Sequence, residues 1–495
     1  MIDLPQSLKA RTEDILADCQ ANIFKPHARR YVFYLIVKWS EELVKHRLRE
    51  LLQRFALGPL GGSTGLKQLE DARAFRKKRE KDGGILTNIF ISGLGMERIL
   101  DEHTLALEDH SFKMGMTKQG QDEPPESWDE NWAKRKSRDN HRKTATLPDA
   151  LLMLAGNDRD ALNDRADLLK QELEREGLGS VVFTEIGERI GADGKSYEPF
   201  GYRDGMSQPP FWSRNKSQLL YRNRPLVLDK ERGSYVVFLK MEQDVPAFDK
   251  AVDEITVNLY YTDPEFREKS LAQIKSLPTY AGHKELVEAQ IMGRAKDGSP
   301  LPLIVKKLKG TKFRKSEEKE FDLFDVPSEK NIPPVPNPFD IGCPLHSHIR
   351  KVNPRNGDDI RKMSKLYKGE VKQRLRIVRR SIPYSEKEAE TGTEKRGLLF
   401  LSFQASISFQ YLTIIREWVD KESFPFDSQN PIPTGVDPII GRAWNINHES
   451  SYTWYEDFAT GKTRTIPYNF QNLVTVRGGE FFYAPSRTWF AKLLP

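Results

Sequence analysis

The segment YVFYLIVK at residues 31–38 sets the pattern from which the fold is predicted. It is short, rich in β-branched and aromatic residues, and bounded by polar residues, which is typical of a buried strand. LTNIFIS at 86–92 has the same character. Between them, apolar residues recur at helical spacing over 43–52, so the chain opens with the order strand, helix, strand.

This alternation continues along the chain. ALLMLAG at 150–156 and SVVFTEIG at 180–187 predict two further strands on either side of a helix over 158–176. The charged segment 113–146 has no clear period, and it predicts a loop. The polar stretch 225–232 predicts the boundary between two halves of mixed strands and helices.

The second half begins with a predicted strand, GSYVVFLKME at 233–242. Helices are expected around 245–255 and 263–275, and again over 408–420. The segments RLRIVRRSIPY and LLFLSFQAS predict a long hairpin, because both are apolar and a charged connector at 385–396 joins them.

Composition limits the class of protein. A chain of 495 residues is long enough for two domains, and the net charge of +7 is a mild excess without the basic arm of a nucleic-acid binder. Cys19 and Cys343 lack the spacing of a disulfide framework or a zinc site. No export signal is recognised, and the longest apolar run is too short to span a bilayer. We therefore expect a cytoplasmic protein that binds neither membranes nor nucleic acids.

The segment FGYRDGMSQPP at 200–210 gathers turn-forming residues around an acid, Asp204. Gly201 and Gly205 have no Cβ, so the backbone can approach a flat ligand closely while the carboxylate projects into the remaining space. A tight turn in which Asp204 caps its own backbone would explain the same residues.

Two histidines stand close together in CPLHSHIRKVNPR at 343–355. Neutral imidazole is the usual axial ligand of haem iron, and the cations that follow His348 would suit the two haem propionates. A zinc site lacks a third ligand at a recognisable spacing. Each histidine could equally be an ordinary surface or core residue.

The segment RLRIVRRSIPYS at 374–385 carries four arginines on a predicted strand. Strand alternation places Arg374, Arg376 and Arg380 on one face, and Arg379 on the apolar face. An arginine on an apolar face needs an anion or a cofactor. An ordinary charged edge strand is the alternative.

Together these segments resemble the dye-decolorising peroxidase family. GYRDG at 201–205 matches its GxxDG motif, HIRKVNPR at 348–355 its proximal-histidine motif, and IVRRSIPY at 377–384 its distal-arginine strand. Flanking blocks also match in register, so the resemblance covers nearly the whole chain.

The resemblance implies an α+β fold of two ferredoxin-like domains, each an antiparallel sheet packed with helices. Residues 1–228 would form the first domain, with the GxxDG motif, and residues 229–495 the second, which would hold most of the haem. The cofactor would be haem b, with His348 as the axial ligand of the iron. Asp204 and Arg379 would meet over the opposite haem face. Further cofactor contacts are expected from Gly205, Arg355, Leu398 and Phe400, although a plain core strand would also explain the last two.

The implied activity is reduction of hydrogen peroxide, through a ferryl haem with a porphyrin radical, coupled to oxidation of dyes, phenols or other aromatic donors. Asp204 could take a proton from the near peroxide oxygen and deliver it to the departing one, while Arg379 stabilises the developing negative charge. Because an adjacent arginine lowers the pKa of an aspartate, dye oxidation is expected to peak at about pH 4 to 5.

Two positions depart from the family pattern. Ser381 stands where relatives usually have Gly or Asn, and Ser408 where they often have an acid. If the acid that hydrogen-bonds the proximal imidazole belonged near 408, its absence would leave the oxidised haem more reactive.

Bulky dyes would need surface aromatics to relay electrons, and Trp444, Trp454 and Tyr455 are candidates, although most aromatics belong to the core. The alternatives to a peroxidase are a haem-handling or haem iron-releasing protein and a non-catalytic haem carrier.

Overall fold

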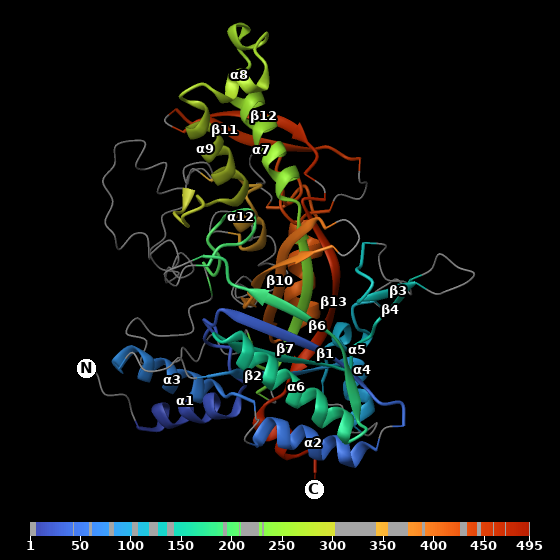
Figure 1. The fold of residues 1–495 in the computed structure, drawn as a ribbon. Helices are drawn as coiled ribbons and strands as arrows, with labels where there is room; N and C mark the ends of the chain where they lie inside the picture. The colour runs from blue at the N-terminus through green and yellow to red at the C-terminus, as the bar shows by residue number, and fades with distance from the viewer. Residues whose placement is uncertain are drawn as a thin grey trace.

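The computed structural model describes residues 6–42, 44–58, 62–78, 84–100, 107–117, 127–135, 143–191, 196–206, 208, 227–229, 232–301, 343–354, 375–388, 392–425, 433–442, 447–458, 460–470 and 472–494. Figure 1 shows helices of the first half near both termini. The elements at the opposite end are α7 (Val245–Tyr260), α8 (Leu271–Lys275), α9 (Tyr280–Met292) and the hairpin of β11 (Ser450–Asp457) and β12 (Lys462–Tyr468). No helix among the described residues is both long and apolar enough to cross a membrane.

The first half of the chain folds as a β-α-β-β-α-β unit. Its four main strands are β1 (Tyr31–Trp39), β2 (Leu86–Ser92), β5 (Ala150–Gly156) and β6 (Gly179–Glu188). They pair antiparallel in the order β6-β1-β5-β2, which is the ferredoxin-like order. The helices of this half are α1 (Gln6–Asp18), α2 (Lys45–Leu57), α3 (Gly65–Lys78), α4 (Gly93–Ile99), α5 (His110–Met114) and α6 (Arg159–Arg175).

The second half repeats this order with five strands. These are β7 (Ser234–Gln243), β8 (Val378–Arg379), β9 (Ile382–Lys387), β10 (Glu394–Gln404) and β13 (Val474–Ala484). The order is β13-β7-β10-β8, and β9 also pairs with β10. The helices are α7 (Val245–Tyr260), α8 (Leu271–Lys275), α9 (Tyr280–Met292), α12 (His348–Val352) and α15 (Arg487–Ala491), with a 3-10 turn at Pro264–Phe266 and π-helical turns at Ile407–Tyr411 and Ile414–Val419.

The two half-sheets join through β2 and β13, where Ser92 pairs with Phe482. The joined sheet buries both of its faces, which explains why β1 is a continuous apolar run. Alternate residues of β1 such as Tyr34 face strands of the other half, and the Tyr34 ring lies 4.9 Å from that of Phe238. The intervening residues, such as Leu35, face α2 and α6. The α+β class with two ferredoxin-like units is confirmed, whereas the boundary at 228/229 stays a prediction.

Three local predictions are wrong. The charged segment 113–146 is not entirely a loop, because it contains the hairpin of β3 (Ala133–Arg135) and β4 (Lys143–Ala145). The predicted helix 263–275 is interrupted, since Ser270 starts α8 with a capping box. The arginine-rich strand begins only at Val378, so alternation cannot be extended back to residues 375–377, and Arg374 lies outside the described residues. The late hairpin of β11 (Ser450–Asp457) and β12 (Lys462–Tyr468) forms a separate small sheet.

Arg380, directly after β8, anchors this strand to the first half of the chain. It is buried, and its guanidinium donates to the carbonyl oxygens of Asn22 (2.6 Å), Ile23 (2.7 Å) and Arg379 (2.9 Å). Arg379 and Arg380 therefore point to opposite sides, as strand alternation predicts.

We expect Arg380→Met to lower the free energy of unfolding by about 3 kcal/mol, because three buried carbonyl groups lose a charged donor. Urea unfolding of both proteins measures this. Arg47→Met is the matched control, since Arg47 forms a half-exposed ion pair with Glu176 and should change stability little. Equal stability of the Arg380 variant and the wild type would contradict the anchoring role.

Candidate active site

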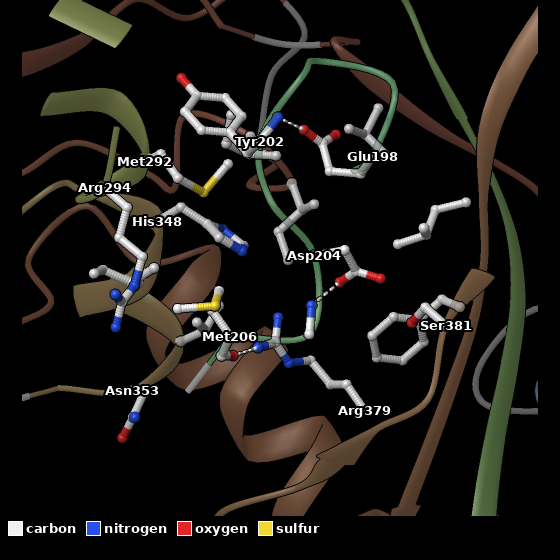
Figure 2. Close-up of a pocket in the computed structure, with 18 of the residues that line it drawn as sticks. Glu198, Tyr202, Asp204, Met206, Met292, Arg294, His348, Asn353, Arg379 and Ser381 are labelled. Carbon is white, nitrogen blue, oxygen red and sulfur yellow. Dashed lines mark hydrogen bonds between the residues drawn. The ribbon is translucent and has the colours of Figure 1, made fainter. Parts of the chain in front are cut away.

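A cavity of about 230 Å³ lies where segments from both halves of the chain meet. Asp204 and Gly205 come from the loop between β6 and β7, Arg379 from β8, and His348 from the start of α12. Figure 2 shows the His348 imidazole directed toward the side of the cavity that carries Asp204 and Arg379. The structure thus brings together the three residues that the motifs single out.

The loop that carries Asp204 depends on its glycines. Gly201 and Gly205 have φ angles of 91° and 76°, which other residues rarely adopt. A Cβ on Gly205 would meet no atom within 4 Å, so this glycine borders open space. Asp204 Oδ1 accepts a hydrogen bond of 2.6 Å from the Gly205 N–H. Asp204 therefore caps its own turn and lines the cavity at the same time.

Glu198 holds the entry to this loop. Its carboxylate accepts hydrogen bonds from the backbone N–H groups of Phe200 (3.0 Å) and Tyr202 (2.8 Å). Gln243 on β7 donates to the same carboxylate. The loop is thereby fixed to the first strand of the second half, which sets where Asp204 projects.

Arg379 is bound to the segment that follows Asp204. Its guanidinium donates to the Met206 carbonyl oxygen (2.8 Å), and its backbone N–H donates to Gln208 Oε1 (3.1 Å). Figure 2 shows the Met206 contact beside Asp204. A cation and a carboxylate from different halves of the chain therefore share one side of the cavity.

His348 is oriented by a buried acid, Asp437. The His348 Nδ1 and Asp437 Oδ2 atoms lie 2.9 Å apart, and Asp437 Oδ1 accepts from the N–H groups of Ile439 and Ile440. Burial would raise the pKa of Asp437, but His348 and the two backbone donors outweigh it, and the pKa lies below its usual value. With Nδ1 engaged, Nε2 is the ring nitrogen available to a ligand in the cavity.

Known proteins resemble this chain in sequence as well as in fold. Residues 337–425 match the family model described as Dyp-type peroxidase, C-terminal. Multifunctional dye peroxidase DyP2 of Amycolatopsis sp. is 28% identical over 378 residues, covering 70% of this chain and 71% of that protein. The chain belongs to the dye-decolorising peroxidase family. Peroxidases of this family are haem enzymes.

Other comparisons agree with this assignment. Peroxidase 2 of Mycetinis scorodonius is 26% identical, with 66% of this chain and 62% of that protein aligned. Among solved structures, a DyP-type peroxidase of Anabaena sp. superposes with a TM-score of 0.71 at 24% identity, covering 99% of this chain and 98% of that one. At that identity, the superposition shows that the fold is shared.

The walls of this peroxidase's cavity are mainly apolar. Leu398 and Phe400 line it from β10, and Ile414 and Trp418 from the helical segment that follows. Arg355 lies outside the described residues, so its predicted propionate contact is not placed. Three other cations, Arg203, Arg294 and Arg376, line the cavity instead. Alternation predicts Arg376 on the strand face opposite Arg379. This is wrong, because both line the cavity and the strand begins two residues after Arg376.

The acid beside the His348 imidazole does not lie near position 408, so the condition under which its absence would make the haem more reactive is not met. Ser408 donates to Asp109 Oδ1 (2.9 Å), whereas Asp437 supplies the acid beside His348. Sequence reasoning missed Asp437; the available signal was one acid among apolar residues in GVDPII at 435–440. Ser381 does line the cavity.

Two of the three relay candidates do not lie at the surface as predicted. Trp454 and Tyr455 are buried, and Trp444 lies outside the described residues. His346 is also buried, and its ring lies 4.4 Å from that of Trp454, so it packs in the core.

Burial changes the pKa of Asp204, a carboxyl group that lines the cavity. It raises the pKa of the Asp204 carboxyl above its usual value, although the Arg379 guanidinium and the Gly205 N–H act to lower it. The expectation that Arg379 would bring this pKa below the ordinary aspartate range is therefore wrong. A base must be ionised to accept a proton. If Asp204 is the base, the reaction with peroxide should therefore slow as the pH falls through the pKa of Asp204.

At low pH, the rate of the reaction with peroxide should fall with pH, and this part of the pH–rate profile is its acidic limb. We expect Arg379→Leu to move the acidic limb to higher pH, because the variant loses the cation that favours ionised Asp204. The loss of rate relative to wild type should therefore be greater at low pH than at neutral pH. Rate constants for the reaction with peroxide, measured across pH for both proteins, test this. A limb that stays in place or moves to lower pH would contradict the coupling of these two residues.

Proposed function

We propose that this peroxidase binds haem b between His348 and the Asp204–Arg379 side of the cavity, and uses hydrogen peroxide to oxidise dyes, phenols and other aromatic donors. The proposal rests on one observation: the cavity combines three groups. The His348 imidazole lies 2.9 Å from the Asp437 carboxylate, and the Asp204 carboxylate and the Arg379 guanidinium line the same cavity. The names of the relatives support the donor class, and one related structure holds 2,6-dimethoxyphenol.

The residues present fit a haem in three respects. His348 has Nδ1 engaged by Asp437, which leaves Nε2 for the iron. The walls are apolar, and Gly205 borders open space that a side chain would otherwise occupy. Arg203, Arg294 and Arg376 offer cations for the propionates, with Arg355 as a further candidate. The second half of the chain supplies most of these groups, which agrees with a haem held mainly by that half.

The haem, when bound, would supply the iron that binds peroxide and the oxidising equivalents that aromatic donors consume. Asp204 accepts the proton of the near peroxide oxygen and returns it to the departing oxygen, which leaves as water. Arg379 keeps its positive charge close to the departing oxygen and favours the ionised state of Asp204. Its hydrogen bond to Met206 holds the guanidinium in this position before peroxide arrives.

Titration of the purified protein with haemin, followed by addition of peroxide and a dye, tests the function. We expect uptake of one haemin for each chain, a strong Soret band, and dye oxidation that requires both haemin and peroxide. Failure to take up haemin would contradict the proposal as a whole. Uptake without dye or phenol oxidation would favour a haem carrier or haem-handling protein instead.

A further inference from the structure

Three methionines line the cavity in which peroxide is expected to react: Met206, Met241 and Met292. Each is partly exposed, and Figure 2 shows Met206 and Met292 among the lining side chains. A thioether is readily oxidised to a sulfoxide, which converts an apolar side chain into a polar one. Methionines in a cavity that binds peroxide are therefore exposed to oxidation, a side reaction that the peroxidase reaction does not require.

Met206 is the methionine bound most directly to the peroxide-handling residues. It lies two residues after Asp204, and its carbonyl oxygen accepts the 2.8 Å hydrogen bond from Arg379. Met292 instead ends α9, and Met241 lies on β7 opposite Leu398. Hydrogen peroxide held by Asp204 and Arg379 would thus be next to the residue that carries the Met206 sulfur.

We propose that Met206 is a self-oxidation site, at which hydrogen peroxide held in the cavity transfers an oxygen atom to the thioether when no aromatic donor is present. This inference rests on the proposed peroxidase function. The sulfur bonds to one peroxide oxygen as the O–O bond breaks, and a proton passes to the other oxygen, so the products are the sulfoxide and water. Sulfur loses two electrons and peroxide gains them.

The sulfoxide would lower the peroxidase activity. Its oxygen is a strong hydrogen-bond acceptor, and the residue that carries it is already bound to Arg379 through its carbonyl group. Competition for the guanidinium donors would draw Arg379 away from peroxide. Activity should therefore decline with sulfoxide formation at Met206, and an aromatic donor should protect the enzyme by consuming the oxidising equivalents.

Peptide mass spectrometry can test this with reference methionines in the same chain. Met114 is 37% exposed at the surface and reports oxidation by bulk peroxide, whereas Met96 and Met153 are fully buried. In the haemin-loaded wild type exposed to peroxide without donor, we expect several-fold more sulfoxide at Met206 than at Met114. Addition of a dye, or the substitution Asp204→Ala, should bring Met206 down to the level of Met114.

Variants link the modification to inactivation. The activity that each variant retains during incubation with peroxide is measured relative to its own starting activity. Met206→Leu should lose activity several times more slowly than Met292→Leu. The inference is overturned if Met206 is oxidised no more than Met114, or equally in the wild type and Asp204→Ala, or if Met206→Leu is inactivated as fast as Met292→Leu. If dye oxidation is normal in these samples, only the self-oxidation site fails; if it is absent, the peroxidase function fails.

Discussion

His348→Ala should produce a protein that no longer retains haem. Among the described residues, His348 is the only histidine that lines the cavity, and its imidazole contacts the buried acid Asp437. Loss of a group that supports a metal ligand typically weakens metal binding about 10- to 100-fold, and loss of the ligand itself should exceed this. Absorption spectra after haemin addition and gel filtration measure retention.

His46→Ala is a suitable control for this experiment. His46 lies on α2 with its side chain 65% exposed, in an ion pair with Glu50, so it should not affect haem binding. Added imidazole should restore part of the Soret band in His348→Ala, because the substitution leaves room beside Asp437. Haem retention equal to wild type in the variant would exclude His348 as the ligand.

Asp204→Ala should slow the reaction with peroxide by roughly 10²- to 10⁴-fold, the usual contribution of a positioned acid–base group. Haem binding should persist, because His348 and Asp437 are unchanged. Asp204→Asn is a stricter variant, since its amide oxygen can still accept from the Gly205 N–H but cannot take a proton. Steady-state oxidation of a dye at varied peroxide concentration measures the effect as a fall in kcat/KM for peroxide.

Asp244→Ala provides the matched control. Asp244 is an exposed carboxylate that caps the start of α7 by accepting from the Ala247 N–H, and it does not line the cavity. Its removal should leave the reaction with peroxide unchanged. A comparable fall in both variants would indicate a general loss of structure rather than loss of a base.

Local patterns were sufficient to predict much of the fold. Strands such as β1 and β5 are continuous apolar runs because the sheet buries both faces, and this makes them recognisable. The opposite orientations of Arg379 and Arg380 follow from alternation within a strand. The meeting of Asp204, Arg379 and His348 in one cavity could be predicted only through the family resemblance.

Features that depend on tertiary packing were not predictable in this way. Asp437 lies 89 residues after His348, and no spacing rule connects them. The inward position of Arg376 depends on where β8 begins, which its neighbours in sequence do not indicate. The pKa of Asp204 was misjudged because the arginine could be counted from sequence, whereas the burial of the carboxyl could not.

The most direct test of the central claim is the rate constant for hydrogen peroxide with haemin-loaded wild type and Asp204→Asn, measured by stopped-flow absorption across pH. Wild type should react faster as the pH rises through the pKa of Asp204 and then level off. The variant should react at least about 100-fold more slowly, without that rise, while its resting spectrum shows bound haem. A variant with the rate and the pH dependence of wild type would contradict the assignment of Asp204 as the base.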